Sequence, residues 1–326
     1  MPVAVVTDST ACLPPGAEDE YPLTIIPMRV TINGYSGAEG TEITTVDIAR
    51  AFQERRVEVS TSRPAPGAVA EIYQRLLDDG ATGVVSVHLS AALSGTYESA
   101  VLAAREFDGK VTVVDSANAG MGLGFCVLAA SAAAKRGRGA RFVADSASAA
   151  SSATDTFFYV DTLEFLRRGG RISAAGALLG TALAVKPILH VESGEVKLRD
   201  KVRTSTRALA RLEDLVVAAG RDGPVDLALH HLRSPERAEE LAHRLRDRFG
   251  RQVREVFITE VGAVIAAHCG PGLLGAVVHR RVKKLSTTQK LSTGPQAPRS
   301  PRPNHARYTG HEYFHASPRT AGHSHR

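Results

Sequence analysis

Short apolar runs and longer stretches of helical spacing follow one another along residues 1–155. The apolar runs predict strands at residues 3–7, 24–32, 83–88 and 111–114. Stretches in which apolar residues recur every three or four positions predict helices at residues 45–55, 68–79, 95–104, 120–134 and 140–153. Strands that alternate with helices of this length favour a mostly parallel, doubly wound sheet. A ligand of such a sheet is expected where the strands end at their carboxyl edge.

The second half of the chain has a different pattern, which begins near Phe157. We predict a strand at 158–161, a short helix at 163–168, and a hairpin that joins 185–190 to 196–199. Five further stretches complete an α+β pattern, at 205–219, 226–231, 235–249, 253–258 and 274–278. Because 326 residues exceed what one hydrophobic core usually supports, we predict an α/β protein of two domains. Residues 1–155 form the N-terminal domain, and residues 156–285 form a C-terminal α/β domain with a mixed sheet.

Residues 286–326 differ in composition from the rest of the chain. They are rich in Pro, Ser, Thr, Gly and Arg, and their apolar residues follow neither a helical nor a strand period. This composition predicts a disordered tail. Six basic residues stand against one acidic residue there, a balance of +5 out of the chain's +6, so residues 1–285 carry only +1. A nearly neutral body argues against nucleic-acid binding. The tail histidines lack the close spacing of a metal site, at His305, His311, His315, His323 and His325.

The cysteines and the hydropathy pattern indicate a cytoplasmic protein. Cys12, Cys126 and Cys269 are odd in number and far apart, which fits a reducing compartment and argues against a structural zinc site. The chain has no run of about 18 apolar residues, and its N-terminus passes directly into a predicted strand. We therefore expect no integral membrane segment, no metal and no cofactor.

Small polar residues stand beside glycine or proline in three stretches: hydroxyl residues at 61–64 and 93–97, and His268 and Cys269 at 268–272. Hydroxyls and free backbone N–H groups at strand ends suit a small anionic or polar head group. The candidate binding residues are Thr61, Ser62, Ser94, Gly95 and His268. In the purely structural alternative, Thr61, Ser62 and Ser94 only cap the helices that follow them. Asp8, Asp115 and Ser116 end two predicted strands and either support the site or form turns.

Six motifs carry a resemblance to a known family. They are DSTACLP at 8–14, TSRPAPG at 61–67, LSGTYESA at 93–100, VDS at 114–116 followed by MGLG at 121–124, DTLEFLRRGGRI at 161–172, and HCGPG at 268–272. In this order, over about residues 3–281, they resemble the DegV family of bacterial fatty-acid-binding proteins. Cys12, Arg63 and Cys269 depart from the residues most frequent in the family, which are an acid, a Gln, and a Thr or Ala.

The resemblance implies a DegV-like fold of two α/β domains that bind a long-chain fatty acid non-covalently between them, such as palmitate, stearate or oleate. Thr61, Ser94 and His268 would then hold the carboxylate, with the N–H groups of Ser62 and Gly95 in support, and the second domain would enclose the tail. The protein would be a carrier and not an enzyme. Some relatives pass the acid to a separate fatty acid kinase, which makes acyl phosphate for phospholipid synthesis.

A buried fatty acid divides its binding energy unequally between head and tail. A sixteen-carbon tail offers on the order of 11 kcal/mol gross at about 0.8 kcal/mol per buried CH₂, against about 1.5–3 kcal/mol for each charge-assisted hydrogen bond. The head group therefore orients the ligand and the tail holds it. Apolar runs predict either tunnel lining or ordinary core, at 178–179, 182–185, 188–189 and 261–267.

Arg171 follows two glycines, which predicts a mobile and exposed guanidinium. We expect Arg171, together with Arg167 and Arg168, to contact an acidic partner surface or an acyl phosphate.

Two enzyme classes are alternatives to the carrier. A serine hydrolase would use Ser94 and His268, with Asp8 or Asp115 to orient the base, but residues 93–96 lack the Gly-x-Ser-x-Gly elbow. A nucleotide-phosphate enzyme would use the turn at 94–96. Against it, neither phosphate-binding glycine motif occurs where a predicted strand meets a helix.

Overall fold

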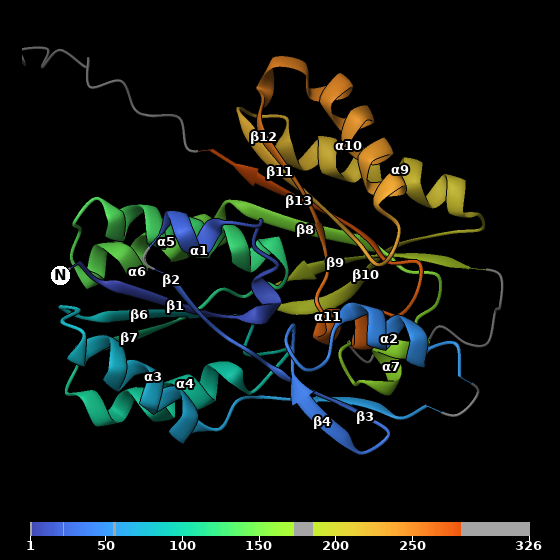
Figure 1. Cartoon of the computed structure of the whole chain (residues 1–326). Helices are drawn as coiled ribbons and strands as arrows, with labels where there is room; N and C mark the ends of the chain where they lie inside the picture. Colours follow the sequence, from blue (N-terminus) through green and yellow to red (C-terminus); the bar gives the residue numbers. More distant parts are fainter. Residues whose placement is uncertain (1, 22, 55–56, 173–184, 282–326) are drawn as a thin grey trace, which may run out of the picture. The chain divides into compact units, whose positions relative to one another are not determined.

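A parallel sheet organises the first part of the chain (Figure 1). The computed structural model describes residues 2–21, 23–54, 57–172 and 185–281. The sheet has the order β2-β1-β6-β7 and all its neighbours are parallel. Its strands are β1 (Ala4–Asp8), β2 (Leu23–Ile26), β6 (Val84–His88) and β7 (Val111–Asp115). Short elements η1 (Ser9–Ala11) and α1 (Ala17–Glu20) connect β1 to β2.

Helices cover both faces of this sheet, which confirms the doubly wound arrangement (Figure 1). One face packs on α5 (Met121–Lys135) and α6 (Ala140–Ser152), and the other on α3 (Pro66–Asp78) and α4 (Thr96–Ala104). The element η2 (Arg105–Phe107) follows α4. In β1, Val5 packs in the first core cluster and Val6 in the second. Because both faces are buried, the strands read as continuous apolar runs in the sequence.

A small antiparallel sheet between β2 and α3 departs from the predicted pattern. The single strand expected over residues 24–32 is wrong: it is two strands, β2 and β3 (Arg29–Ile32), which belong to different sheets. Pro27 stands between them and has no N–H to donate to a strand ladder. β3 pairs with both β4 (Tyr35–Ala38) and β5 (Val59–Ser62). An Asn-Gly turn at residues 33–34 joins β3 to β4, with positive φ at both residues.

The helix α2 (Thr45–Ala51) is shorter than the predicted 45–55. Thr44 and Asp47 form a reciprocal capping box at its start, in which each accepts the backbone N–H of the other. This cap and the helix that follows it connect the small sheet to the rest of the protein.

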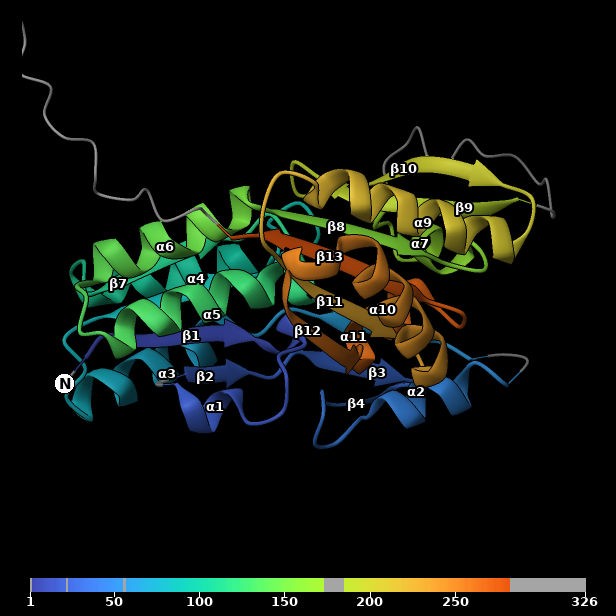
Figure 2. The same cartoon turned by 90° about the horizontal axis from the view of Figure 1, so that it is seen from above.

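A mixed sheet of six strands organises residues 154–280, as predicted (Figure 2). The order is β10-β9-β8-β13-β11-β12, antiparallel at every pair except β11 with β12. The strands are β8 (Thr154–Tyr159), β9 (Lys186–Glu192), β10 (Glu195–Val202), β11 (Val225–His231), β12 (Val253–Glu260) and β13 (Leu274–Arg280). β8 begins and ends earlier than the predicted 158–161. The predicted hairpin corresponds to β9 and β10.

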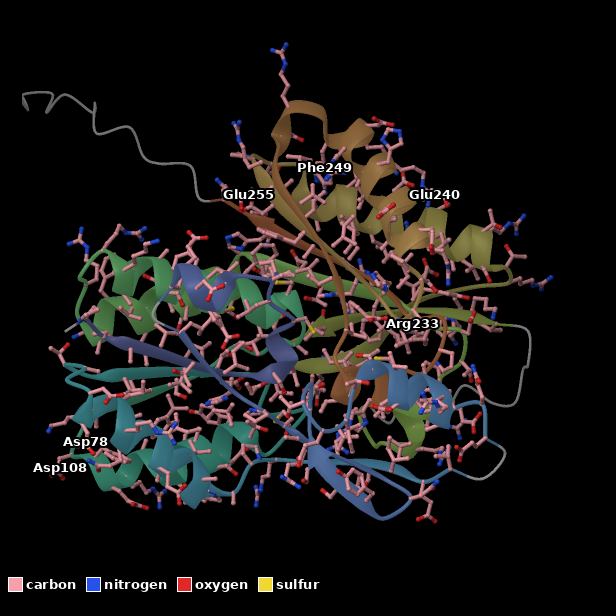
Figure 3. The ribbon with its side chains drawn as sticks, viewed as in Figure 1. Asp78, Asp108, Arg233, Glu240, Phe249 and Glu255 are labelled. Atoms are coloured by element: carbon pink, nitrogen blue, oxygen red, sulfur yellow. The ribbon has the colours of Figure 1, made fainter. Side chains whose placement is uncertain are left out.

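Two helices, α9 (Ser205–Gly220) and α10 (Pro235–Phe249), cover one face of the mixed sheet, and η3 (Gly250–Gln252) follows α10 (Figures 1 and 2). Phe249 is buried there, whereas Glu240 and Glu255 are exposed (Figure 3). In β8, Tyr159 packs in the core beneath α9 and α10, and Phe158 packs with α7 (Glu164–Arg168) and α11 (Ala263–Cys269). The face of the sheet that carries Phe158 contributes to the wall of the cavity described below.

The two large sheets draw on separate stretches of the chain, with β8 beginning at Thr154. The division into domains at residues 1–155 and 156–285 stays a prediction, and residues 286–326 lie outside the described residues. Among the described helices, none combines the length and the apolar composition that crossing a membrane requires. The described residues also contain no group of three or more His, Cys, Asp or Glu side chains placed to hold a metal ion.

Candidate ligand-binding site

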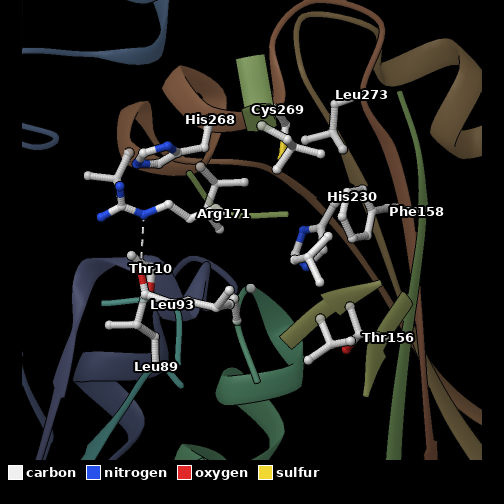
Figure 4. Close-up of a pocket in the computed structure, with 18 of the residues that line it drawn as sticks. Thr10, Leu89, Leu93, Thr156, Phe158, Arg171, His230, His268, Cys269 and Leu273 are labelled. Carbon is white, nitrogen blue, oxygen red and sulfur yellow. Dashed lines mark hydrogen bonds between the residues drawn. The ribbon is translucent and has the colours of Figure 1, made fainter. Parts of the chain in front are cut away.

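A cavity lies where the carboxyl ends of the parallel strands face the mixed sheet (Figure 4). Its empty space, which includes the solvent-filled mouth, is about 860 Å³. Most of the lining is apolar: Met28, Leu89, Leu93, Ala119, Phe157, Phe158, Leu166, Val191, Val196, Val264, Ile265 and Leu273. The parallel sheet supplies residues just beyond β6 and β7, as expected for the carboxyl edge of a doubly wound sheet.

Thr61 and His268, which are 207 positions apart in sequence, meet at one side of this cavity. Thr61 Oγ1 and His268 Nε2 are 2.8 Å apart. When Nε2 carries the ring proton, it donates a hydrogen bond to Thr61 Oγ1, and the Thr61 hydroxyl can then donate its own hydrogen bond to a ligand. Thr61 faces inward because β5 alternates, and the same alternation leaves Ser62 exposed. Ser62 does not line the cavity.

His268 is in the last turn of α11, and the expectation that it lies at the end of a strand is wrong. Burial lowers the pKa of its imidazole from 6.5 to about 4, and the nearby Arg171 guanidinium acts in the same direction. His268 is therefore neutral near pH 7. Gly169 makes this position possible, because a Cβ there would lie 2.3 Å from His268 Nδ1.

Ser94 also lines the cavity, with its Oγ 2.9 Å from Thr96 Oγ1. The capping alternative is wrong for these hydroxyls. Gly95 is the N-cap of α4 and Ala65 that of α3, and neither helix receives a side-chain cap. Gly95 itself is not a lining residue. The Arg63 side chain lies against it, since a Cβ at Gly95 would be 2.5 Å from Arg63 Nη1.

Arg171 is held in place, contrary to the expectation that it is mobile and exposed. Its side chain is partly buried, Nε donates to the Leu93 carbonyl oxygen at 3.1 Å, and Nη1 donates to the Gly169 carbonyl oxygen. Figure 4 shows it beside His268. The guanidinium therefore brings a fixed positive charge to the polar side of the cavity.

A second hollow of about 940 Å³ shares Thr61, Arg171 and His268 with the cavity. Ser60 of β5 and Arg168 of α7 add to its polar lining, whereas Arg167 is not among the residues that line it. The three shared residues thus border both spaces. A chemical group bound to these three residues can therefore be contacted from the cavity and from the second hollow.

Asp8 does not face the cavity, although it supports a residue that does. Its carboxylate accepts hydrogen bonds from the hydroxyl of Thr10 at 2.5 Å and from the Leu89 N–H at 3.0 Å, and it pairs with His88 Nδ1 at 3.0 Å. His88 Nε2 in turn lies 2.7 Å from Ser86 Oγ. Ser86, His88 and Asp8 have the composition of a hydrolase triad, but all three are fully buried and none lines the cavity.

Asp115 and Ser116 form turns and do not line the cavity. Asp115 accepts the backbone N–H groups of Ala91 and Ala117, and Ser116 Oγ bonds with the backbone of Asn118. These bonds fix the loop that brings Ala119 and Gly120 to the cavity wall.

His230 lines the opposite side of the cavity from Arg171, near Thr156 (Figure 4). Its Nε2 accepts the Met121 N–H at 2.8 Å, and its Nδ1 lies 2.9 Å from Thr259 Oγ1. Burial lowers its pKa to about 4. Because both ring nitrogens are occupied and the ring is neutral, this side of the cavity offers a ligand no charge.

The apolar runs that were expected to be either tunnel lining or ordinary core divide between cavity wall and core. Val264 and Ile265, from the run at 261–267, line the cavity. Ile188 and Leu189 do not, because they are buried in two core clusters on opposite faces of β9. Residues 178–179 and 182–184 lie outside the described residues.

Comparison with known proteins identifies the family. A profile described as an uncharacterised protein of the DegV family matches residues 2–281. The chain belongs to the DegV family. A DegV domain-containing protein of Streptomyces coelicolor is 50% identical to it over 279 residues, which cover 86% of this chain and 99% of that protein.

Solved DegV structures share the fold. A structure titled as fatty-acid binding by a DegV family protein of Thermus thermophilus has a TM-score of 0.79 and 33% identity, covering 86% of this chain and all of that one. DegV of Bacillus subtilis, described as a fatty acid binding protein, has a TM-score of 0.78 and 30% identity, with the same coverage. The α/β architecture read from the sequence is thereby confirmed.

Three polar residues of this DegV chain, Thr10, Thr156 and His230, line the cavity but were not predicted as site residues. Thr10 belongs to the DegV motif at 8–14, and its place beside Asp8 was an available signal. No sequence signal marked His230. It is near the end of an apolar strand, β11, which pairs with β13, and the fold brings it to the cavity.

Proposed function

We propose that this DegV protein is a carrier that binds one long-chain fatty acid, such as palmitate, stearate or oleate, in the cavity. Thr61, Ser94 and His268, which all line it, hold the carboxylate. The observation that carries the proposal is an apolar cavity that has the hydroxyl of Thr61, the imidazole of His268 and the guanidinium of Arg171 together at one side. The Thermus thermophilus and Bacillus subtilis proteins are both described as binding fatty acids, which is the same ligand class.

Electrostatics favours an anion at this side of the cavity. A carboxylate removed from water needs several donors and a compensating charge. Thr61 and Ser94 supply hydroxyl protons, and Arg171 supplies the positive charge because His268 is neutral near pH 7. The apolar tail extends toward the side lined by His230, whose nitrogens are already satisfied.

The geometry counts against the hydrolase alternative. Ser94 Oγ lies beside Thr96, His268 pairs with Thr61, and Asp8 pairs with His88. In the described part of the chain these side chains form no serine–histidine–aspartate relay at the cavity. The carrier is expected not to react with a fluorophosphonate probe.

We further propose that the carrier presents its fatty acid to a separate kinase in the cytoplasm, for acyl-phosphate formation in phospholipid synthesis. Arg171 borders both the cavity and the second hollow, where Arg168 adds a further positive charge. This position suits contact with an acyl phosphate or an acidic partner surface. Arg171→Ala, assayed at a fatty acid concentration that keeps the variant loaded, should abolish kinase-coupled phosphorylation. Unchanged phosphorylation would contradict the partner role.

The test of the ligand is direct analysis of the purified protein. Protein from a bacterial host is denatured, extracted with organic solvent and analysed for fatty acids by mass spectrometry. Wild type should carry near-stoichiometric acid, and a Thr61→Ala/Ser94→Ala double variant should carry much less. A Ser62→Ala variant is the matched control, because that hydroxyl is exposed and outside the cavity. Absence of acid from wild type would reject the proposed function.

A further inference from the structure

Glu39 is a buried carboxylate that no part of the proposed binding chemistry uses. It follows β4, is 7% exposed, and has no basic partner among the described residues. Burial raises the pKa of this carboxyl, and nearby Asp8 adds to the effect. A buried acid without a cation is costly, so its hydrogen bonds must compensate.

The two oxygens of Glu39 bind different walls of the cavity. Oε1 accepts the Val264 N–H at 2.7 Å, and Oε2 accepts the Ser9 hydroxyl. Ser9 Oγ also accepts the Met28 N–H at 3.0 Å. Val264 and Met28 both line the cavity, and Ser9 precedes Thr10, which lines it too.

The bond to Val264 fixes the start of α11. The N-cap of this helix is Gly262, which has no side chain to cap it, so Glu39 supplies the missing acceptor from another part of the chain. Gly262 permits the approach, because a Cβ there would lie 2.3 Å from Glu39 Oε1. The helix is only two turns long, so its start and His268 in its last turn move together.

We propose that Glu39 is a positioning residue of the ligand site, whose carboxylate holds α11, and with it His268, against the wall formed by Thr10 and Met28. This inference rests on the proposed function for its effect on affinity. Its effect on the position of His268 does not depend on any ligand.

Four full-length variants separate positioning from general stability. Glu39→Ala removes both bonds, and Glu39→Gln keeps an acceptor for Val264 and a polar contact with Ser9. Gly262→Ala disturbs the same contact from the side of α11. Glu42→Ala is the matched control: it removes an exposed carboxylate of the same loop, which accepts only the Ala38 N–H at 2.6 Å.

Two measurements are made on each folded variant: the dissociation constant for the fluorescent fatty acid cis-parinarate, and the pKa of His268 by NMR. Loss of one charge-assisted hydrogen bond corresponds to about tenfold in affinity. We expect Glu39→Ala and Gly262→Ala to weaken binding about tenfold and to move the His268 pKa from about 4 toward 6.5. Glu39→Gln and Glu42→Ala should resemble wild type in both.

An unchanged His268 pKa in folded Glu39→Ala would overturn the proposal, as would an equal effect of Glu42→Ala. Should Glu39→Ala not fold, Gly262→Ala and Ser9→Ala give the same comparison, since each disturbs one of the two bonds. Failure of wild type to bind cis-parinarate would reject the proposed function alone, because the pKa measurement still tests the position of His268.

Discussion

Acidification should tighten ligand binding through His268. In the free protein the pKa of this side chain is about 4, because it is buried and lies near Arg171. An anionic head group beside the ring favours the imidazolium and raises its pKa by about 1–3 units. The bound protein then holds more protons than the free protein between the two pKa values, so affinity rises as pH falls through the higher one.

The magnitude follows from the same linkage. With a rise of about 2 units, from about 4 to about 6, the ring is neutral in both states at pH 7. At pH 5 it is mostly charged in the bound state and mostly neutral in the free state. The dissociation constant should therefore fall about tenfold between pH 7 and pH 5.

The assay needs a ligand whose own head group does not titrate. Hexadecane-1-sulfonate remains an anion throughout this range, and isothermal titration calorimetry gives its affinity directly. His268→Gln should bind with no such pH dependence, which isolates the contribution of this ring. An affinity of the wild-type protein that stays constant or weakens at pH 5, with circular dichroism unchanged, would refute the reasoning.

Two other predictions concern glycine packing and acid stability. Gly169→Ala should displace His268 and weaken ligand binding about tenfold or more, whereas Gly67→Ala, whose added Cβ meets nothing within 4 Å, should leave titrations with the same ligand unchanged. The folded-state pKa of His230 is lowered to about 4, so protons bind the unfolded state preferentially as pH falls below about 6.5, and this residue alone should lower the free energy of unfolding by about 2 kcal/mol between pH 8 and pH 5. His268 and His279, whose pKa values are also lowered to about 4, act in the same direction, and a urea unfolding midpoint that is unchanged at pH 5 would contradict this account.

The periodicity of apolar residues identified the helices and strands whose apolar side chains form one uninterrupted buried face or run. The helix predicted at 235–249 matches α10 at both ends, and the strand at 83–88 differs from β6 by one residue. The small sheet was harder to predict. Its strand β4 contains Ser, Gly and Ala, and β5 contains Ser and Thr, so neither has the apolar alternation typical of a strand.

The site was predictable where chemistry is local and not where it depends on packing. Thr61, Ser94 and His268 were found because hydroxyls and an imidazole stand out beside Gly or Pro, and all three line one cavity. Their partners depend on long-range contacts that no local pattern encodes. Asp8 is the clearest case, since its pairing with His88 joins residues 80 positions apart.

The separation of the polar site residues along the chain has a consequence for biosynthesis. Ser94 lies in the first third of the chain and His268 near the end of the described residues, with 174 positions between them. At about 5–20 residues per second, roughly 10–35 s pass between their syntheses. The parallel sheet can fold during this interval, but the cavity wall is still missing α11. The site proposed for a lipid is therefore incomplete until α11 has been synthesised.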